Sequence, residues 1–494
     1  MFNMYTLLFV IKKGNVAVLL NNMSNEYGLV KDKMINFNKR SNTLEQTEYI
    51  YMLQDVSEPH LYRHLFNYEE VPKVAFNHRH VPMRPPEQIW ITDSTFRDGQ
   101  QAREPYTVNQ IVEIFKFLHR LGGPKGIIRQ TEFFLYSKKD KEAVTKCLEL
   151  GYDFPEITSW IRAVKEDFQL VKDMGLKETG ILASCSDYHI FKKLKMTRKQ
   201  AMEQFLSIVK SALEIGVIPR VHLEDITRAD FYGFVVPFVL ELMKLQEETK
   251  IPIKVRACDT LGFGVSYPGV ALPRSVPGII YGLWHHAGVP SEQLEWHGHN
   301  DFYKAVSNAS TAWLYGCSGI NCTLLGIGER TGNCPLEAMV FEYASLRGTL
   351  DGMDTTVITE IADYYTREIG YHIPPMTPLV GREFNFTRSG IHADGLLKDE
   401  EIYNIFNTEK LLNRKVVVAV NEHSGAAGIA HWINSYFNLK DERRIEKRDP
   451  RMLKLKEWVD KQYEEGRNTV IGDHELVEFL QAEIPELWEE VNRR

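Results

Sequence analysis

The chain has 494 residues, a formal net charge of −7, 44% hydrophobic residues and 25% charged residues. This composition is that of an ordinary globular protein, and the Lys and Arg residues are scattered, so nothing in it points to nucleic acid as a partner. The length exceeds that of one small domain but fits a single α/β barrel with appendages.

The N-terminal region carries no clear membrane or export signal. Its apolar run, 5–11, is too short to span a bilayer, and Lys12 and Lys13 follow that run instead of preceding it. The six cysteines include no Cys-x-x-Cys pair, which is typical of reduced thiols. We therefore expect a cytoplasmic protein, with residues 1–48 as a poorly ordered extension and residues 49–87 as an irregular, proline-rich arm.

From residue 88 onward, apolar strand-like runs alternate with amphipathic helical stretches. Eight such units within residues 88–350 match the number and size of a (β/α)8 TIM barrel. A doubly wound open sheet would need a glycine-rich turn after the first strand, and residues 93–98 do not form one. The predicted strands are 88–93, 126–134, 154–160, 178–184, 218–223, 253–258, 293–296 and 318–324. The predicted helices are 109–121, 139–150, 163–174, 198–215 and 229–249.

After the barrel the alternation stops. We expect residues 351–438 to form a linker and a small α+β lobe, and residues 439–494 to form a charged helical tail. The tail has the amphipathic pattern of a packing or dimerisation appendage.

The active site of a TIM barrel lies at the C-terminal ends of its strands. His297 and His299 are two residues apart, so on an extended strand both imidazoles point to one side, as a metal site needs. Asp98, at the end of the first strand, adds a carboxylate. Such a site suits Mg²⁺ or Mn²⁺ chelated by a 2-oxo acid, with Co²⁺ or Zn²⁺ as alternatives.

Other polar residues at the strand ends have a functional and a structural interpretation. Arg97 can stabilise an oxyanion or form a surface salt bridge. Glu224 can act in acid–base chemistry or pair at the barrel mouth, and Thr260 can bind a substrate carboxylate or cap a helix. The glycines of Gly326–Gly332 do not have dinucleotide-binding spacing, so we expect a turn near the substrate.

Together these residues resemble the DRE-TIM metallolyase family, specifically its Claisen-condensing acyltransferases: isopropylmalate, homocitrate, citramalate and Re-citrate synthases. The resemblance covers about residues 88–435. It rests on four motifs, which are Thr95–Gln101, His297–Asp301, Gly326–Asn333 and Ser389–His392. The chain departs from the family at Gln100, where Glu is usual, and at Thr387 and Arg388, where His-Glu is usual.

The resemblance implies a mechanism and its residues. The implied metal ligands are Asp98, His297, His299 and Asn333. The residues expected to bind substrate are Arg97, Gln101, Arg129, Arg220, Thr260 and Arg388, and the catalytic ones are Arg97, Glu224, His392 and Tyr403. His392 and Tyr403 deprotonate the methyl group of acetyl-CoA from the neighbouring protomer, so a domain-swapped homodimer is expected. The carbanion attacks the ketone, and thioester hydrolysis releases CoA.

The 2-oxo acid is expected to be a dicarboxylate. Arg220 lies four residues before Glu224 and matches the arginine that homocitrate synthases use for the distal carboxylate. A buried arginine needs an anion, although Arg220, Arg129 and Arg388 can instead pair with glutamates of the protein. The resemblance is strongest to Re-citrate synthases, which implies oxaloacetate. Homocitrate synthase, 2-isopropylmalate synthase and an acyl-CoA lyase running the retro-Claisen direction are the alternatives.

Overall fold

The computed structural model describes residues 29–30, 35–38, 43–46, 50–162, 164–439 and 441–492. The chain divides into two compact units, one ending at Met353 and the other beginning at Asp354, and each is described by itself. Most of the predicted extension lies outside the described residues. Two antiparallel pairs are described in the extension and the first residues of the arm. They are β1 (Leu29–Val30) with β4 (Ile50–Tyr51) and β2 (Ile35–Asn38) with β3 (Thr43–Gln46).

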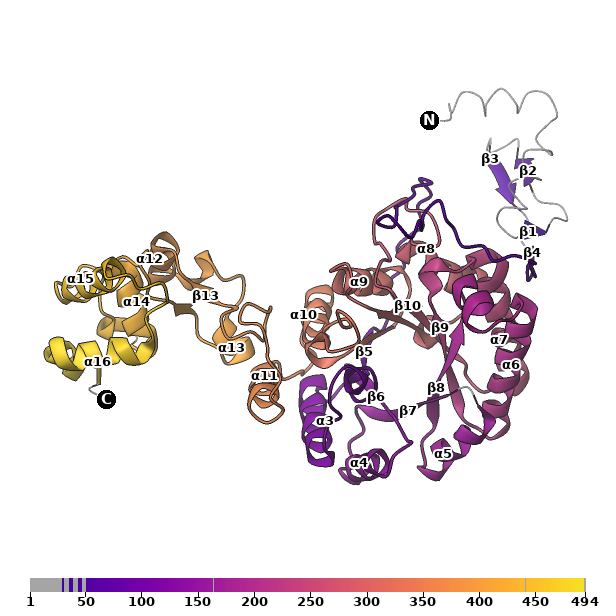
Figure 1. Cartoon of the computed structure of the whole chain (residues 1–494), viewed down its shortest axis with the longest axis horizontal. Coiled ribbons are helices and arrows are strands. Elements are labelled where there is room, and N and C mark those ends of the chain that lie inside the picture. The colour runs from indigo at the N-terminus through magenta and orange to yellow at the C-terminus, as the bar shows by residue number, and fades with distance from the viewer. Residues whose placement is uncertain are drawn as a thin grey trace. The chain divides into compact units, whose positions relative to one another are not determined.

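Eight parallel strands of the first unit close into a barrel, in the order β10-β11-β12-β5-β6-β7-β8-β9 (Figure 1). They are β5 (Trp90–Asp93), β6 (Ile128–Phe133), β7 (Glu156–Ile161), β8 (Glu178–Ser184), β9 (Ile218–Glu224), β10 (Lys254–Asp259), β11 (Leu294–Gly298) and β12 (Gly319–Cys322). The closed barrel confirms the predicted TIM fold and rules out the open sheet. The predicted strands match these strands to within a few residues.

Helices surround the barrel and connect its strands (Figure 1). They are α3 (Val108–Gly122), α4 (Lys138–Glu149), α5 (Phe168–Asp173), α6 (Arg198–Glu214), α7 (Val236–Thr249), α8 (Val276–Tyr281), α9 (Ala305–Tyr315) and α10 (Leu336–Arg347). Capping boxes begin α3, α4 and α6, where Thr107, Ser137 and Thr197 each accept a backbone hydrogen bond from the third helical residue.

Every second residue of each strand points into the barrel. The side chains at these inward positions are polar as well as apolar. On β9, Arg220, His222 and Glu224 share the inner face. The register pairs Lys254 of β10 with Arg220, and Arg256 with His222. These pairs form two successive layers, with the Arg220 layer nearer the N-terminal ends of the strands.

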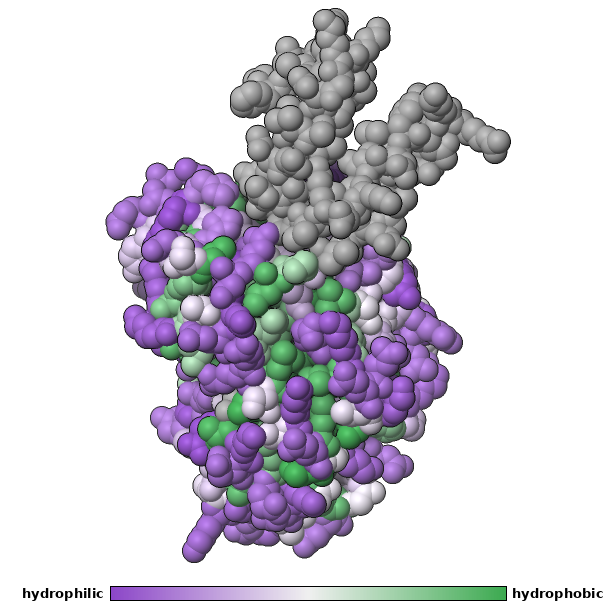
Figure 2. Space-filling model, turned by 90° about the vertical axis from the view of Figure 1, so that its right-hand side faces the viewer, coloured by the Kyte–Doolittle hydropathy of each residue, from purple (hydrophilic) through white to green (hydrophobic). Residues whose placement is uncertain are grey.

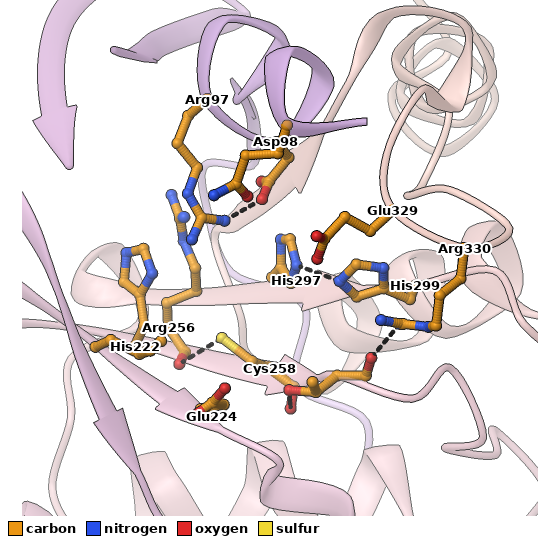
Figure 3. A pocket seen from close by; sticks show the side chains of 13 residues that line it. Arg97, Asp98, His222, Glu224, Arg256, Cys258, His297, His299, Glu329 and Arg330 are labelled. Atoms are coloured by element: carbon orange, nitrogen blue, oxygen red, sulfur yellow. Dashed lines mark hydrogen bonds and ion pairs between the residues drawn. The ribbon is translucent and has the colours of Figure 1, made fainter. Parts of the chain in front are cut away.

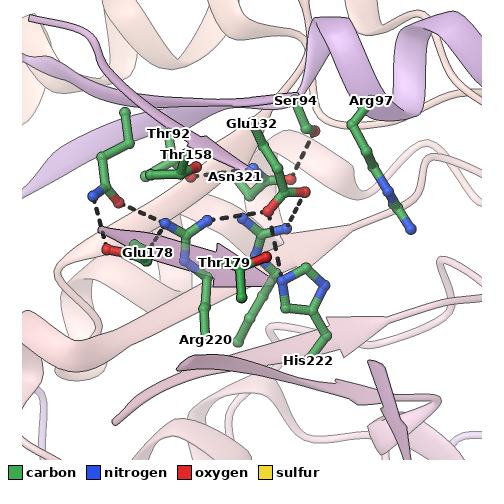
Figure 4. A network of polar contacts seen from close by, with 12 residues as sticks. Thr92, Ser94, Arg97, Glu132, Thr158, Glu178, Thr179, Arg220, His222 and Asn321 are labelled. Atoms are coloured by element: carbon green, nitrogen blue, oxygen red, sulfur yellow. Dashed lines mark hydrogen bonds and ion pairs between the residues drawn. The ribbon is translucent and has the colours of Figure 1, made fainter. Parts of the chain in front are cut away.

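Three buried glutamates neutralise these cations, and Figure 4 shows Glu132 and Glu178 beside Arg220. Glu178 binds Arg220 and also accepts a 2.6 Å hydrogen bond from Lys254. Glu132 accepts from both arginines at 3.2 Å, and Glu295 binds Arg256. Because charges this deeply buried are costly without partners, the network fixes the side chains of the inner layers.

The second unit is an α+β lobe followed by helices. Its elements are α11 (Val357–Arg367), β13 (Phe386–Thr387), α12 (Gly390–Lys398), α13 (Thr408–Leu412), β14 (Val417–Val418), α14 (Ala426–Tyr436), α15 (Arg451–Glu464), α16 (Asp473–Glu483) and α17 (Pro485–Asn492). The strands β13 and β14 pair in parallel. Residues of α14 share one apolar core with α15, α16 and α17, among them Ile433, Leu455, Leu480 and Leu487.

The face seen in Figure 2 is mostly hydrophilic, with hydrophobic residues gathered between the polar ones in its middle. Apolar residues between polar ones are normal on a protein surface. In the described part of the chain, no helix is both long enough and apolar enough to cross a membrane.

A buried arginine fastens the N-terminal arm to the barrel. Arg198, at the start of α6, is fully buried and binds Asp187 at 2.7 Å and Asp230 at 3.0 Å. Its Nη1 also donates to the backbone oxygen of Gln54 in the arm, at 3.1 Å. One side chain therefore neutralises two carboxylates and joins the arm to the barrel.

We expect Arg198→Met to lower the free energy of unfolding by about 3–5 kcal/mol, because it leaves buried carboxylates without a counter-charge. Thermal and urea denaturation measure this loss. Lys244→Met is the matched control: Lys244 pairs with Glu241 at the surface, so a change of about 0.5 kcal/mol or less is expected. Equal effects of the two substitutions would contradict the assignment.

Candidate active site

One pocket opens where the strands of the barrel end (Figure 3). It brings together seven of the residues singled out from the sequence, which are Arg97, Asp98, Gln101, Glu224, Thr260, His297 and His299. The other lining residues are Leu182, His222, Arg256, Cys258, Glu329 and Arg330. Residues from six barrel strands or the segments that follow them therefore meet in one cavity.

The two histidines face each other. Their Nε2 atoms are 3.3 Å apart, close to the separation of two neighbouring nitrogen ligands on an ion that lies about 2.1 Å from each. His297 Nδ1 lies 2.7 Å from the amide oxygen of Asn321, which also accepts from Ser94. The proton of His297 is therefore on Nδ1, and Nε2 keeps its lone pair.

Burial keeps both imidazoles neutral. It lowers the pKa of His297, and it lowers the pKa of His299 to about 3, with the neighbouring His297 adding to the effect. Neutral imidazole is the form that binds metal ions. The pair is thus ready to act as ligands at neutral pH.

Asp98 is buried and bound to its neighbour. Its Oδ1 accepts a hydrogen bond from Arg97 Nη1, and its Oδ2 has no hydrogen-bond partner among the described residues. Burial alone would raise the pKa of Asp98, but the charge of Arg97 holds it below the usual range. Arg97 is itself positioned over the ring of Trp160, 4.8 Å from the ring centre.

The chemistry of these donors fits a divalent ion, although their arrangement is open. As the side chains lie, no three His, Cys, Asp or Glu groups of the described ranges stand close enough together to hold a metal ion. The free Oδ2 of ionised Asp98 and the two facing imidazoles are suitable ligands. Asn333, whose backbone pairs with that of His299, also has a buried side-chain oxygen without a partner in this part of the chain.

Glu224 is held as a carboxylate. It accepts hydrogen bonds from Ser184, from His189 at 2.9 Å and from Lys193 at 3.2 Å. Burial would raise the pKa of Glu224, but these partners lower it to about 2. Glu224 therefore stays ionised at neutral pH and is an acceptor of hydrogen bonds, not a proton donor.

Thr260 supports the backbone next to Glu224. Its Oγ1 accepts a 2.9 Å hydrogen bond from the backbone N–H of Asp225, which has a left-handed φ of 65°. Its own hydroxyl proton has only a weak 3.5 Å contact, to the backbone oxygen of Cys258. The hydroxyl can therefore still donate to a ligand in the pocket.

Two of the predicted substrate-binding arginines do not line the pocket. Arg220 is 1% exposed and belongs to the deeper layer, where it binds Glu178 and donates to Gln130 at 2.6 Å. Arg129 lies at the start of β6, stacked between Trp90 and Phe154. Their surroundings match the structural alternative, in which these arginines are held by groups of the barrel itself.

His392, Tyr403 and Arg388 belong to the second unit. The rings of exposed His392, on α12, and of Tyr403 lie 4.4 Å apart between centres. Arg388 forms an ion pair with Glu383. Within its own unit, this group contains an adjacent imidazole and phenol, but no acceptor that fixes the imidazole is described.

Three inner residues of the pocket were not predicted from the sequence. His222 and Arg256 are partners in the β9–β10 register, and Cys258 lies two residues beyond Arg256. The signal was present, because every second residue before Glu224 and along β10 must face inward. These positions precede the strand ends, so the strand-end rule does not include them.

A buried carboxyl group holds the connection between β12 and α10, which carries Asn333. Glu337, on α10, accepts a 3.1 Å hydrogen bond from the backbone N–H of Leu325. Burial raises the pKa of Glu337 to about 7. The folded protein therefore keeps this proton at pH values where the unfolded chain has lost it.

We expect a pH-dependent loss of stability that Glu337→Gln removes. Because the folded pKa is raised, the contribution of Glu337 is complete below pH 4.5 and is lost as the pH rises through 7. Between pH 5 and pH 8.5 the variant should gain roughly 2–3 kcal/mol relative to the natural protein, measured by denaturant unfolding. Glu113→Gln, at an exposed pair, is the control; an equal gain there would refute the assignment.

The fold and the pocket define a TIM-barrel protein with a donor set suited to a divalent metal. The HMGL-like family matches residues 88–364. The chain is 60% identical to the Citrate (Re)-synthase of Clostridium kluyveri over 451 residues, 91% of this chain and 100% of the relative. It is 57% identical to the Citrate (Re)-synthase of Syntrophus aciditrophicus over 436 residues, covering 88% of this chain and 69% of that one.

A third relative, the 2-phosphinomethylmalate synthase of Streptomyces hygroscopicus, is 37% identical over 431 residues, 86% of this chain and 96% of that one. The chain belongs to the HMGL-like family, which confirms the resemblance to the DRE-TIM metallolyases. Synthases of this family generally use a divalent metal.

Proposed function

We propose that this protein is a Re-citrate synthase that condenses acetyl-CoA with oxaloacetate to give citrate and free CoA. The observation that carries the proposal is the pocket itself, where the facing His297 and His299 meet Asp98 and Arg97. The high identity to two relatives named Citrate (Re)-synthase over most of the chain supports the choice of reaction. The same grounds support an acyltransferase that turns the acyl group into an alkyl group on transfer.

In this proposal, Asp98, His297, His299 and Asn333 hold the divalent metal, with Mn²⁺ or Mg²⁺ as the expected ion. The ion would supply a Lewis acid for the carbonyl group of the 2-oxo acid. Arg97 faces the same carbonyl oxygen, and its guanidinium stabilises the negative charge that develops there as the new bond forms. The stacking on Trp160 reduces the reorganisation that this step needs.

Glu224 and Thr260 orient the substrate. Glu224 is ionised and accepts a hydrogen bond, while the Thr260 hydroxyl donates to a carboxylate oxygen of the 2-oxo acid. Gln101 is exposed at the mouth of the pocket, where it contacts the incoming substrate. Arg388 stays a candidate for substrate contact from the second unit.

The base comes from the second unit of a neighbouring protomer. His392 removes a proton from the acetyl methyl group, with Tyr403 beside its ring. The resulting carbanion attacks the ketone carbon, the oxyanion takes up a proton, and water cleaves the thioester to release CoA. A homodimer in the cytoplasm is the working form we propose, and the buried free cysteines agree with a reducing compartment.

Turnover with different acceptors tests the reaction. Purified protein with acetyl-CoA should release CoA rapidly with oxaloacetate, with citrate as the product on chromatography. We expect turnover at least about 100-fold slower with 2-oxoglutarate or 2-oxoisovalerate, because each differs in chain length or in the distal carboxylate. Turnover with 2-oxoisovalerate but not with oxaloacetate would refute a dicarboxylate substrate. Cleavage of an acyl-CoA in the absence of any 2-oxo acid would favour a lyase.

Removal of the metal provides a second test. Dialysis against a chelator should abolish CoA release, and Mn²⁺ or Mg²⁺ should restore it, because the two imidazoles and Asp98 otherwise lack their common partner. Asp98→Asn should weaken metal binding about 10-fold or more, as measured by calorimetric titration of Mn²⁺. Full activity of metal-depleted protein would disprove the assigned ligands.

Mixed dimers test the source of the base. Asp98→Asn and His392→Ala should each be inactive alone, while an equimolar mixture after subunit exchange should regain about a quarter of the natural activity. The reason is that half of the dimers are mixed, and each of those has one intact site. A mixture of Asp98→Asn with His299→Ala is the control and should stay inactive. Failure of the first mixture to recover would place His392 in its own protomer's site, and full activity of His392→Ala alone would place it outside the reaction.

A further inference from the structure

We propose that Arg256, with His222 beside it, forms the subsite for the distal carboxylate of the 2-oxo dicarboxylate, in place of Arg220. The inference rests on the proposed function and names the residues that determine specificity at the same site. It replaces the expectation drawn from the sequence, in which Arg220 had this role.

The register of the barrel separates the two arginines by depth. Arg256 pairs with His222, and both line the pocket. Arg220 pairs with Lys254, one inward layer nearer the N-terminal ends of the strands. Two residues along a strand correspond to about 6.6 Å. Arg220 therefore lies below the pocket floor, and its Nη2 is already bound to Glu178 and Gln130.

Arg256 has a donor to spare. Its Nε binds Glu295 and its Nη1 donates to Glu132 at 3.2 Å, whereas the buried Nη2 has no hydrogen-bond partner within the described residues. The side chain is 1% exposed, so solvent does not compensate for the missing bonds. A buried N–H without an acceptor costs about 1–3 kcal/mol, and a ligand carboxylate is the acceptor that a guanidinium binds best.

His222 provides a second donor at the same level. Its Nε2 is buried and likewise unpartnered in the described chain, and the nearest acid oxygen, of Glu132, is 3.7 Å away. Burial and the charge of Arg256 lower the pKa of His222 well below its usual value. The imidazole is therefore neutral and adds a hydrogen bond without adding charge.

Gly180 makes room for this imidazole. A Cβ atom at Gly180 would lie 2.7 Å from His222 Nε2, closer than any side chain tolerates. The absence of a side chain at this position of β8 lets the ring stand inside the barrel next to the pocket. Leu182, the next inward residue of β8, lines the same pocket.

The other two arginines of the pocket pair with acids of their own, although Arg97 Nε also lacks a partner among the described residues. Arg97 binds Asp98, where the keto group is expected. Arg330 is 39% exposed, pairs with Asp301 at 2.9 Å and donates to the backbone oxygen of Thr260. Arg256 alone among the three lies at the inner end, held rigidly by two glutamates, so that little reorganisation is needed when a carboxylate binds.

The test compares oxaloacetate with 2-oxobutyrate, which has the same chain length and a methyl group in place of the distal carboxylate. The natural protein should prefer oxaloacetate by about 1,000-fold or more in kcat/KM. Arg256→Lys keeps the charge but removes the planar fork, and should reduce this preference by about 10- to 100-fold. The loss should appear as a higher KM for oxaloacetate, with kcat/KM for 2-oxobutyrate changed by about 3-fold or less.

Arg220→Lys provides the matched comparison, because it makes the same change one layer deeper. It should leave the preference within about 3-fold of the natural value, whatever it does to stability. His222→Gln, which removes no charge, should reduce the preference by about 5- to 10-fold and serves if Arg256→Lys does not fold. A collapse of the preference in Arg220→Lys, or an unchanged preference in folded Arg256→Lys or His222→Gln, would overturn the proposal.

Direct binding separates this inference from the proposed function. Oxaloacetate and 2-oxobutyrate are titrated calorimetrically into the Mn²⁺-loaded protein without acetyl-CoA. Tighter binding of oxaloacetate that is lost in Arg256→Lys supports the subsite even if no citrate forms. Equal binding of the two acids by the natural protein overturns the subsite, while citrate formation in the assay would still stand.

Discussion

The register of the parallel strands inside the barrel is the constraint on which the site depends. It sets Arg220 beside Lys254, Arg256 beside His222 and Cys258 beside His297, so that charge and function are sorted by depth. The deepest layer is neutralised by glutamates and serves stability. Since a shift of one residue would turn every inward side chain outward, the same register that buries these charges also presents the imidazoles to the pocket.

Burying a charge in this barrel costs free energy, so nearly every buried charge is paired with an opposite one. Three cations and three glutamates share the lower layers, and several of the buried polar atoms that have no partner among the described residues line the pocket. Arg256 Nη2, His222 Nε2 and Asp98 Oδ2 are such atoms. Their position separates binding groups from structural ones more clearly than residue type does, since Arg220 and Arg256 are chemically identical.

The local rules of the sequence predicted most of the fold. The alternation of strand-like runs with amphipathic helical stretches predicted the barrel. The strand-end rule brought Asp98, Glu224 and the His297–His299 pair to one end. Arg129, at the start of its strand, lies outside the reach of this rule.

The sequence by itself determined the barrel, its eight strands and the identity of the donors at the strand ends, because these follow from periodicity and spacing along the chain. Only the tertiary structure decided which arginine reaches the pocket. Arg220 and Arg256 both point inward, and their difference lies in depth and in which glutamates surround them. Such neighbours come from strands far apart in the sequence, so their pairing exists only once the barrel has closed.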